Sequence, residues 1–153
     1  MFKNKLHEKI VTSKPEFETF LAETKISSPI YIFDIKDEID STDIVEKVYR
    51  YKELFPESNK TYVKAWHSGF YTHRKTDYFD ELIKVVEQKV SYLMHLRSPH
   101  SKAEVAQSWS IIYRKGDKTD WHNHFEPSYS AVYYAQVEEN PSPLVFSTKT
   151  QIT

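Results

Sequence analysis

The stretch that decides the fold is residues 108–146, SWSIIYRKGDKTDWHNHFEPSYSAVYYAQVEENPSPLVF. It alternates β-forming runs with turn residues and contains a His-x-His pair, His122 and His124. On an extended backbone, side chains two residues apart point to the same face. Their Cβ atoms would lie roughly 7 Å apart, a span across which two imidazoles can bind one metal ion. The pair therefore predicts a metal site with His122 and His124 as ligands.

The sequence around the pair predicts strands joined by turns. The first strand spans 108–113, with Trp109, Ile111 and Tyr113 on one face. Gly116 marks a turn, because glycine reaches positive φ without steric cost. A second strand is predicted over 129–137, which is rich in valine and tyrosine, and a third begins at 144–146.

Upstream of residue 107, the sequence predicts helices and flanking strands. Ser13 and Glu16 have capping-box spacing and would begin a helix with Phe17, Phe20 and Leu21 on one side. Strands are predicted over 27–35 and 62–66. A helix capped by Ser41 or Thr42 would continue to about Leu54.

The strongest helical periodicity extends from Thr76 or Asp77 to about His95. We expect the apolar face of this helix to pack on the sheet that carries the histidines. That face comprises Phe79, Leu82, Ile83, Val86, Val90 and Leu93.

Length and composition indicate one domain over 1–153, with helices and flanking strands in 1–107 and the first core strands in 108–153. A net charge of −1 gives no indication of nucleic-acid binding. No apolar run is long enough to span a membrane. The chain has no cysteine, which excludes thiolate metal sites and suits a cytoplasmic location.

The motif resembles the iron(II)- and 2-oxoglutarate-dependent oxygenases, and most closely a group with His-x-His followed by Ser-Gly-Val-Tyr-Tyr at this spacing. Here the match is His122, His124 and 130–134, with Ala131 where glycine is usual. Tyr113 and Gly116 resemble the Tyr-x-x-Gly that precedes the metal motif in prolyl-hydroxylase-like members. Segments 28–31 and 66–68 also resemble the group. The similarity extends loosely over residues 28–149 and is specific around the histidines.

This resemblance implies an α+β fold built on a double-stranded β-helix, a cupin-like jelly roll supported by N-terminal helices. It implies Fe(II) and 2-oxoglutarate as cofactors and hydroxylase-type oxidation of a substrate. His122 and His124 would bind the metal, and Tyr113 and Tyr133 would contact 2-oxoglutarate. A facial site with three protein ligands leaves room for a bidentate oxo-acid and oxygen, and imidazole suits Fe(II). Most members carry Asp or Glu where this chain has His124.

The third metal ligand does not follow from the local spacing. Asp120 and Glu126 share the parity of the histidines, but a straight strand holds such positions too far apart to converge on one ion. In the family, a later histidine completes the site and an Arg or Lys binds 2-oxoglutarate. This chain has no histidine after His124 and no arginine after Arg114. His67, His73 or His100 could in principle replace the missing ligand.

The number of strands also indicates that part of the family's fold is missing from this sequence. A jelly roll needs about eight strands, and this region supplies roughly three or four. We therefore expect an incomplete jelly roll that lacks the C-terminal part, while closure of the sheet in another way stays open. Unpaired strand edges at 129–137 and 144–152 would recruit a second copy, which predicts a homodimer.

A function of another class also fits the sequence, namely a non-catalytic cupin-like or β-sandwich binding module with an aromatic-rich face. A His-x-His pair in a strand is weak evidence without its flanking pattern. Strand packing is the ordinary role of Tyr113 and Tyr133. No sequence feature identifies the substrate, whether a small molecule or a protein side chain.

Overall fold

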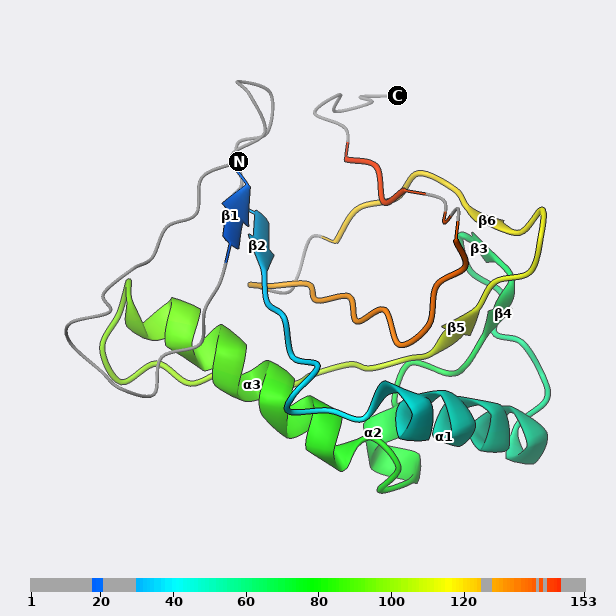
Figure 1. Ribbon diagram of the computed structural model, residues 1–153, viewed down its shortest axis with the longest axis horizontal. Helices are drawn as coiled ribbons and strands as arrows, with labels where there is room; N and C mark the ends of the chain where they lie inside the picture. The colour runs from blue at the N-terminus through cyan, green and yellow to red at the C-terminus, as the bar shows by residue number, and fades with distance from the viewer. Residues whose placement is uncertain (1–17, 21–29, 125–127, 140, 142, 147–153) are drawn as a thin grey trace. The chain divides into compact units, whose positions relative to one another are not determined.

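A computed structural model describes residues 18–20, 30–124, 128–139, 141 and 143–146. Among these residues the longest elements are two helices, α1 at Ser41–Leu54 and α3 at Asp80–His95. The described residues fall into two compact units, one comprising those up to Lys36 with those from Val137 onward, the other spanning Asp37–Gln136. A single domain over 1–153 therefore stays a prediction. The elements in chain order are β1 Glu18–Phe20, β2 Ile30–Ile32, α1 Ser41–Leu54, β3 Val63–Lys64, β4 Trp66–His67, α2 Thr72–Lys75, α3 Asp80–His95, β5 Ile111–Ile112 and β6 Lys118–Thr119 (Figure 1).

The strands form antiparallel pairs, β1 with β2, β3 with β6 and β4 with β5. In the larger unit, Val63 lies opposite Thr119 and Trp66 lies opposite Ile112. Residues 63–64 thus pair with β6, and residues 66–67 pair with β5. Residues 113–117 form a loop opposite Ala65. The described residues establish helices and short antiparallel strand pairs. The double-stranded β-helix stays a prediction.

Helix α1 begins one residue after its cap. The Asp40 carboxylate accepts hydrogen bonds from the backbone N–H groups of Thr42 (2.9 Å) and Asp43 (3.4 Å), so the predicted cap at Ser41 or Thr42 is wrong. Aspartate is as good a cap as serine, and sequence alone does not separate neighbouring candidates. Lys47 lies 2.6 Å from Asp43 at i,i+4 spacing, and the predicted end near Leu54 is confirmed.

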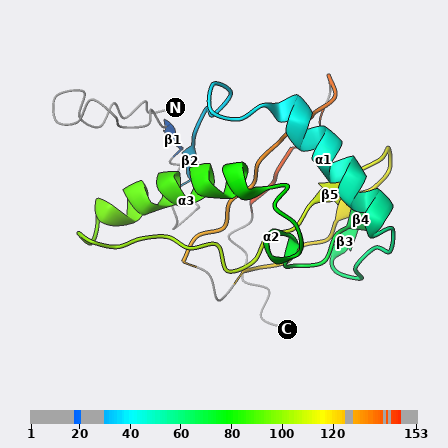
Figure 2. The same cartoon turned by 90° about the horizontal axis from the view of Figure 1, so that it is seen from below.

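The core of the larger unit lies between α1 and the start of α3. Ile44 and Tyr51 are buried on one side of α1, and Phe79 is buried just before α3. The Tyr51 ring lies 4.7 Å from the ring of Phe55 and 6.2 Å from that of Phe79, within the range of favourable aromatic pairing. Figure 2 shows the later part of α1 beside β4. The ring contact between Tyr51 and Phe79 joins α1 to the start of α3.

Helix α3 begins at Asp80 rather than at Thr76 or Asp77, because the Asp80 N–H closes a turn on the Asp77 carbonyl (3.2 Å). On its apolar face, Phe79 and Leu93 are buried and the other predicted residues are half-buried. Glu87 and Ser91 accept hydrogen bonds from backbone N–H groups of the 103–105 segment, both at 2.8 Å. Packing of this face on a histidine-bearing sheet stays a prediction.

Several predicted elements differ from those observed. Residues 18–20 are a strand rather than part of a helix, because they pair with β2; the rest of that predicted helix lies outside the described residues. Of the strand predicted over 27–35, 30–32 are confirmed. The strands predicted over 129–137 and 144–146 are wrong as far as these residues are described, since none has a ladder partner. Valine and tyrosine favour a strand only where a neighbouring strand accepts its hydrogen bonds.

Within the described part of the chain, we find no helix of the length and apolarity that crossing a membrane requires.

Tyr51 provides a test of the core. Its side chain is 0% exposed, and its hydroxyl has no hydrogen-bond partner among the described residues. A buried hydroxyl without a partner destabilises the folded state. We expect Tyr51→Phe to raise the free energy of unfolding by about 1 kcal/mol in urea denaturation. Tyr49→Phe is the control on the same helix, because Tyr49 is 49% exposed. A clear loss of stability in Tyr51→Phe would mean that the hydroxyl is bonded.

Candidate functional site: a pair of imidazoles

His122 and His124 bring their imidazoles together just after β6. Their Nε2 atoms are 3.2 Å apart, and their ring centroids are 5.0 Å apart at an interplanar angle of 70°. Two nitrogens bound to one ion at about 2.1 Å, with angles of roughly 90–110°, would be about 3.0–3.4 Å apart. The observed separation therefore suits a chelating pair. His122 and His124 are not in a regular strand. Their side chains nevertheless lie close together, as the assumed strand geometry predicted.

The backbone of Asp120 orients the first imidazole. The Asp120 N–H donates to the Tyr62 carbonyl (2.9 Å), which extends the pairing of β3 with β6 by one step. The Asp120 carbonyl lies 3.0 Å from Nδ1 of His122. A carbonyl can only accept, so Nδ1 carries the proton and Nε2 of the neutral ring keeps its lone pair. Metal-bound histidines in proteins are held by the same kind of bond on their other nitrogen.

Aromatic rings stack on both histidines. Tyr62 lies parallel to His122, with ring centroids 5.8 Å apart at 8°. Trp109 lies parallel to His124, with centroids 6.2 Å apart at 12°. Trp109 also stacks on His67 (5.9 Å, 15°), which is 2% exposed and comes from β4. The stack links the candidate site to the buried part of the unit.

This environment changes the protonation of His124. The residue as a whole is exposed, but neighbouring protein atoms shield its ring from water, and this desolvation lowers the pKa of His124. The nearby His122 lowers it further, because two positive charges at this distance repel each other. The ring of His124 is thus favoured in its neutral form, which is the form that binds metal.

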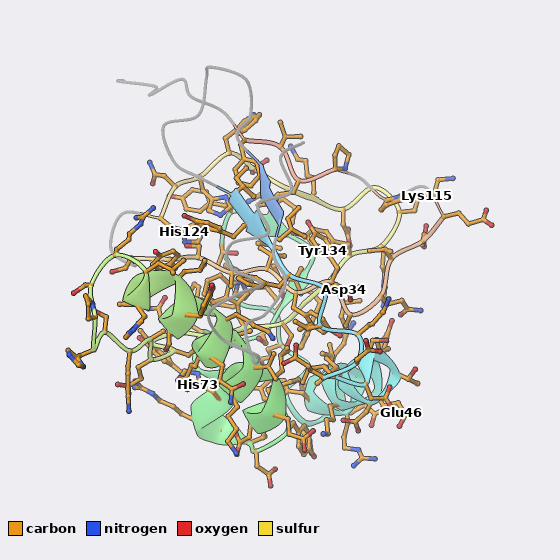
Figure 3. All side chains as sticks on the ribbon, turned by 60° about the vertical axis from the view of Figure 1, so that its left-hand side comes forward. Asp34, Glu46, His73, Lys115, His124 and Tyr134 are labelled. Carbon is orange, nitrogen blue, oxygen red and sulfur yellow. The ribbon has the colours of Figure 1, made fainter. Side chains whose placement is uncertain are left out.

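The described residues contain no group of three or more His, Asp or Glu side chains arranged to hold one ion. The Asp120 carboxylate pairs instead with Lys118 (2.9 Å) and Lys64 (3.7 Å), and these lysines lower the pKa of Asp120. His73 is bonded to Ser108 (2.7 Å), and Figure 3 shows it away from His124. Neither His67 nor His100 joins the pair. Glu126 lies outside the described residues.

Neither of the two tyrosines predicted to contact 2-oxoglutarate is bonded to the imidazole pair in the described residues. The Tyr113 hydroxyl is hydrogen-bonded to the Thr119 hydroxyl. Tyr133 is half-buried; burial raises the pKa of Tyr133, and so does the charge of Asp40 at the cap of α1. Its neighbour Tyr134 is separate from His124 in Figure 3. The roles of Tyr113 and Tyr133 at a cofactor stay predictions.

Sequence reasoning did not identify Tyr62 and Trp109 as neighbours of the histidines. Trp109 shares the parity of Ile111 and Tyr113, and that alternation was the available signal, but it indicates a face rather than a partner. The stacking on Tyr62 depends on the pairing of β3 with β6, which involves a strand of two residues. Such a short element has no recognisable sequence signal.

Comparison with protein-family models, curated proteins and solved structures found no match to this chain. The oxygenase resemblance therefore rests on the motif residues alone.

The stack predicts a dependence of stability on pH. Desolvation lowers the pKa of the buried His67 below its ordinary value of 6.5. The unfolded chain therefore binds the proton more readily, so stability is full above about pH 6.5 and is lost as pH falls through the lower pKa of the folded state. We expect the free energy of unfolding to fall less steeply in His67→Gln than in the original chain between about pH 7 and pH 5.

Urea denaturation at several pH values measures this effect. His95→Gln is the control for replacing a histidine outside the stack, at the exposed end of α3. Equal slopes for His67→Gln and the original chain would show that His67 is not held neutral by burial.

Proposed function

We propose that His122 and His124 are two ligands of a mononuclear metal centre in an iron(II)- and 2-oxoglutarate-dependent oxygenase. The observation that carries this proposal is the 3.2 Å separation of their Nε2 atoms, with Nδ1 of His122 bonded to the Asp120 carbonyl. In the metal-free chain the same 3.2 Å separation fits a hydrogen bond in which Nε2–H of His124 donates to Nε2 of His122, so a metal would take the place of that proton. The Ser-x-Val-Tyr-Tyr continuation at 130–134 adds the link to oxygenases.

The residues of the chain would act on the metal in defined ways. His122 would donate the lone pair of Nε2 while its Nδ1–H stays on the Asp120 carbonyl, which fixes the ring. His124 would donate as a neutral ring, held flat by Trp109. Bound Fe(II), with a 2-oxo acid and oxygen, would supply the oxidising power to hydroxylate a C–H bond. The described residues give no positive fit for the 2-oxo acid.

A non-catalytic binding module is the second candidate. Tyr62 and Trp121 are 62% and 66% exposed beside the histidines, an unusual position for large aromatic side chains. Ligand binding on these rings without metal would favour the module over the oxygenase. Under either function we propose the cytoplasm as the location, because the chain has no cysteine. A homodimer also stays a proposal, although the described residues at 129–137 and 144–146 form no strand whose edge could carry it.

Metal titration tests the proposal. We expect the metal-free chain to bind one Zn²⁺ per chain as a surrogate for Fe(II), weakly, because two imidazoles compete poorly with water. His122→Ala and His124→Ala should each weaken binding by about tenfold or more, since each removes one of the two donors. Isothermal titration calorimetry gives the stoichiometry and the affinity.

The control is His95→Ala, which removes an exposed histidine from the last turn of α3 and should leave Zn²⁺ binding unchanged. Retention of stoichiometric Zn²⁺ by the His122→Ala, His124→Ala double variant would exclude the pair as ligands. A second assay measures oxygen uptake. Uptake that requires both Fe(II) and 2-oxoglutarate would support the oxygenase over a metal-binding module.

A further inference from the structure

The β4–β5 pair has a second face, away from the imidazoles. Neighbouring residues of a strand point to opposite faces. His67 of β4 stacks on Trp109, which stacks on His124, whereas Trp66 of β4 lies opposite Ile112 and lines a cavity of about 370 Å³. This volume is within the range of small-molecule sites. The cavity is therefore distinct from the metal-binding pair.

Two cations from separate elements line this cavity. Lys52 comes from the last turn of α1, and Arg114 comes from the loop that projects opposite Ala65. Among the ion pairs of the described residues, none includes Lys52 or Arg114. Asp117 also lines the cavity, but its carboxylate accepts a hydrogen bond from the Arg114 backbone N–H (2.7 Å). The lining carries one net positive charge.

The indole of Trp66 forms part of the wall. Trp66 is 8% exposed, and its Nε1–H is buried without an acceptor among the described residues. A buried N–H without a partner destabilises the protein. The Lys52 ammonium lies 5.5 Å over the same ring. The apolar side chains of Pro56 and Ile112 complete the wall.

We propose that this cavity binds a small organic anion that carries one carboxylate or phosphate group on an apolar body. Arg114 and Lys52 would hold the anionic group, because guanidinium and ammonium donors form charge-assisted hydrogen bonds with such oxygens. Pro56 and Ile112 would contact the apolar body. One net positive charge suits a ligand with a single anionic group.

Fluorine NMR of the metal-free chain labelled with 5-fluorotryptophan tests this site, because Trp66, Trp109 and Trp121 give separate signals that Trp→Phe variants assign. The probe is benzoate, and benzamide is its neutral analogue. We expect benzoate to shift the Trp66 signal to saturation, with smaller changes at Trp109 and Trp121, and benzamide to bind about tenfold or more weakly. Inorganic phosphate at constant ionic strength tests the anionic group without the apolar body.

Charge-removing variants test the residues. Arg114→Gln and Lys52→Gln should each weaken benzoate binding by about tenfold. Lys115→Gln is the matched control, because Lys115 is an exposed cation in the same loop and does not line the cavity. Equal binding of benzoate and benzamide, an unresponsive Trp66 signal, or an equal loss in Lys115→Gln and Arg114→Gln would each overturn the proposal.

Discussion

The antiparallel pairing of β4 with β5 is the constraint on which the larger unit depends. It fixes Trp66 opposite Ile112 and His67 opposite Ile111, and so directs neighbouring side chains of β4 to opposite faces. One face leads through His67 and Trp109 to His124. The other face borders the cavity that is lined by Lys52 of α1 and by Arg114. A slip of this register by one residue would exchange the two faces and disrupt both arrangements.

The pairing of β3 with β6 supplies the other part of the site. It is short, but its last hydrogen bond joins Asp120 to Tyr62, and Asp120 in turn orients His122. The opposed lysines of this ribbon, Lys64 and Lys118, would repel each other, and both contact the Asp120 carboxylate. Asp120 thus stabilises the ribbon through its side chain and orients an imidazole through its backbone. The imidazole pair depends on backbone geometry more than on its own side-chain packing.

The sequence predicted the parts of this structure that depend on local patterns. Helix α1 follows from the period of Ile44, Val48 and Tyr51, and the turn at Gly116, where φ is 91°, follows from glycine's freedom. The proximity of His122 and His124 was predicted from their spacing, although the two residues are not in a regular strand. In contrast, residues 129–137 have strand-forming side chains and no strand, because pairing depends on a partner elsewhere in the chain. The stacking of Tyr62 and Trp109 on the histidines arises from tertiary pairing and was not predictable for the same reason.

The protonation and metal response of the histidine nitrogens test the central claim most directly. A long-range ¹H–¹⁵N spectrum of the chain labelled with ¹⁵N-histidine reports the tautomer of each ring and the binding state of each nitrogen. Without metal, His122 should carry its proton on Nδ1, as its bond to the Asp120 carbonyl requires. On addition of Zn²⁺, the Nε2 signals of His122 and His124 should move together toward the metal-bound range. A His122 protonated on Nε2, or a metal response at other histidines and not at this pair, would contradict the account.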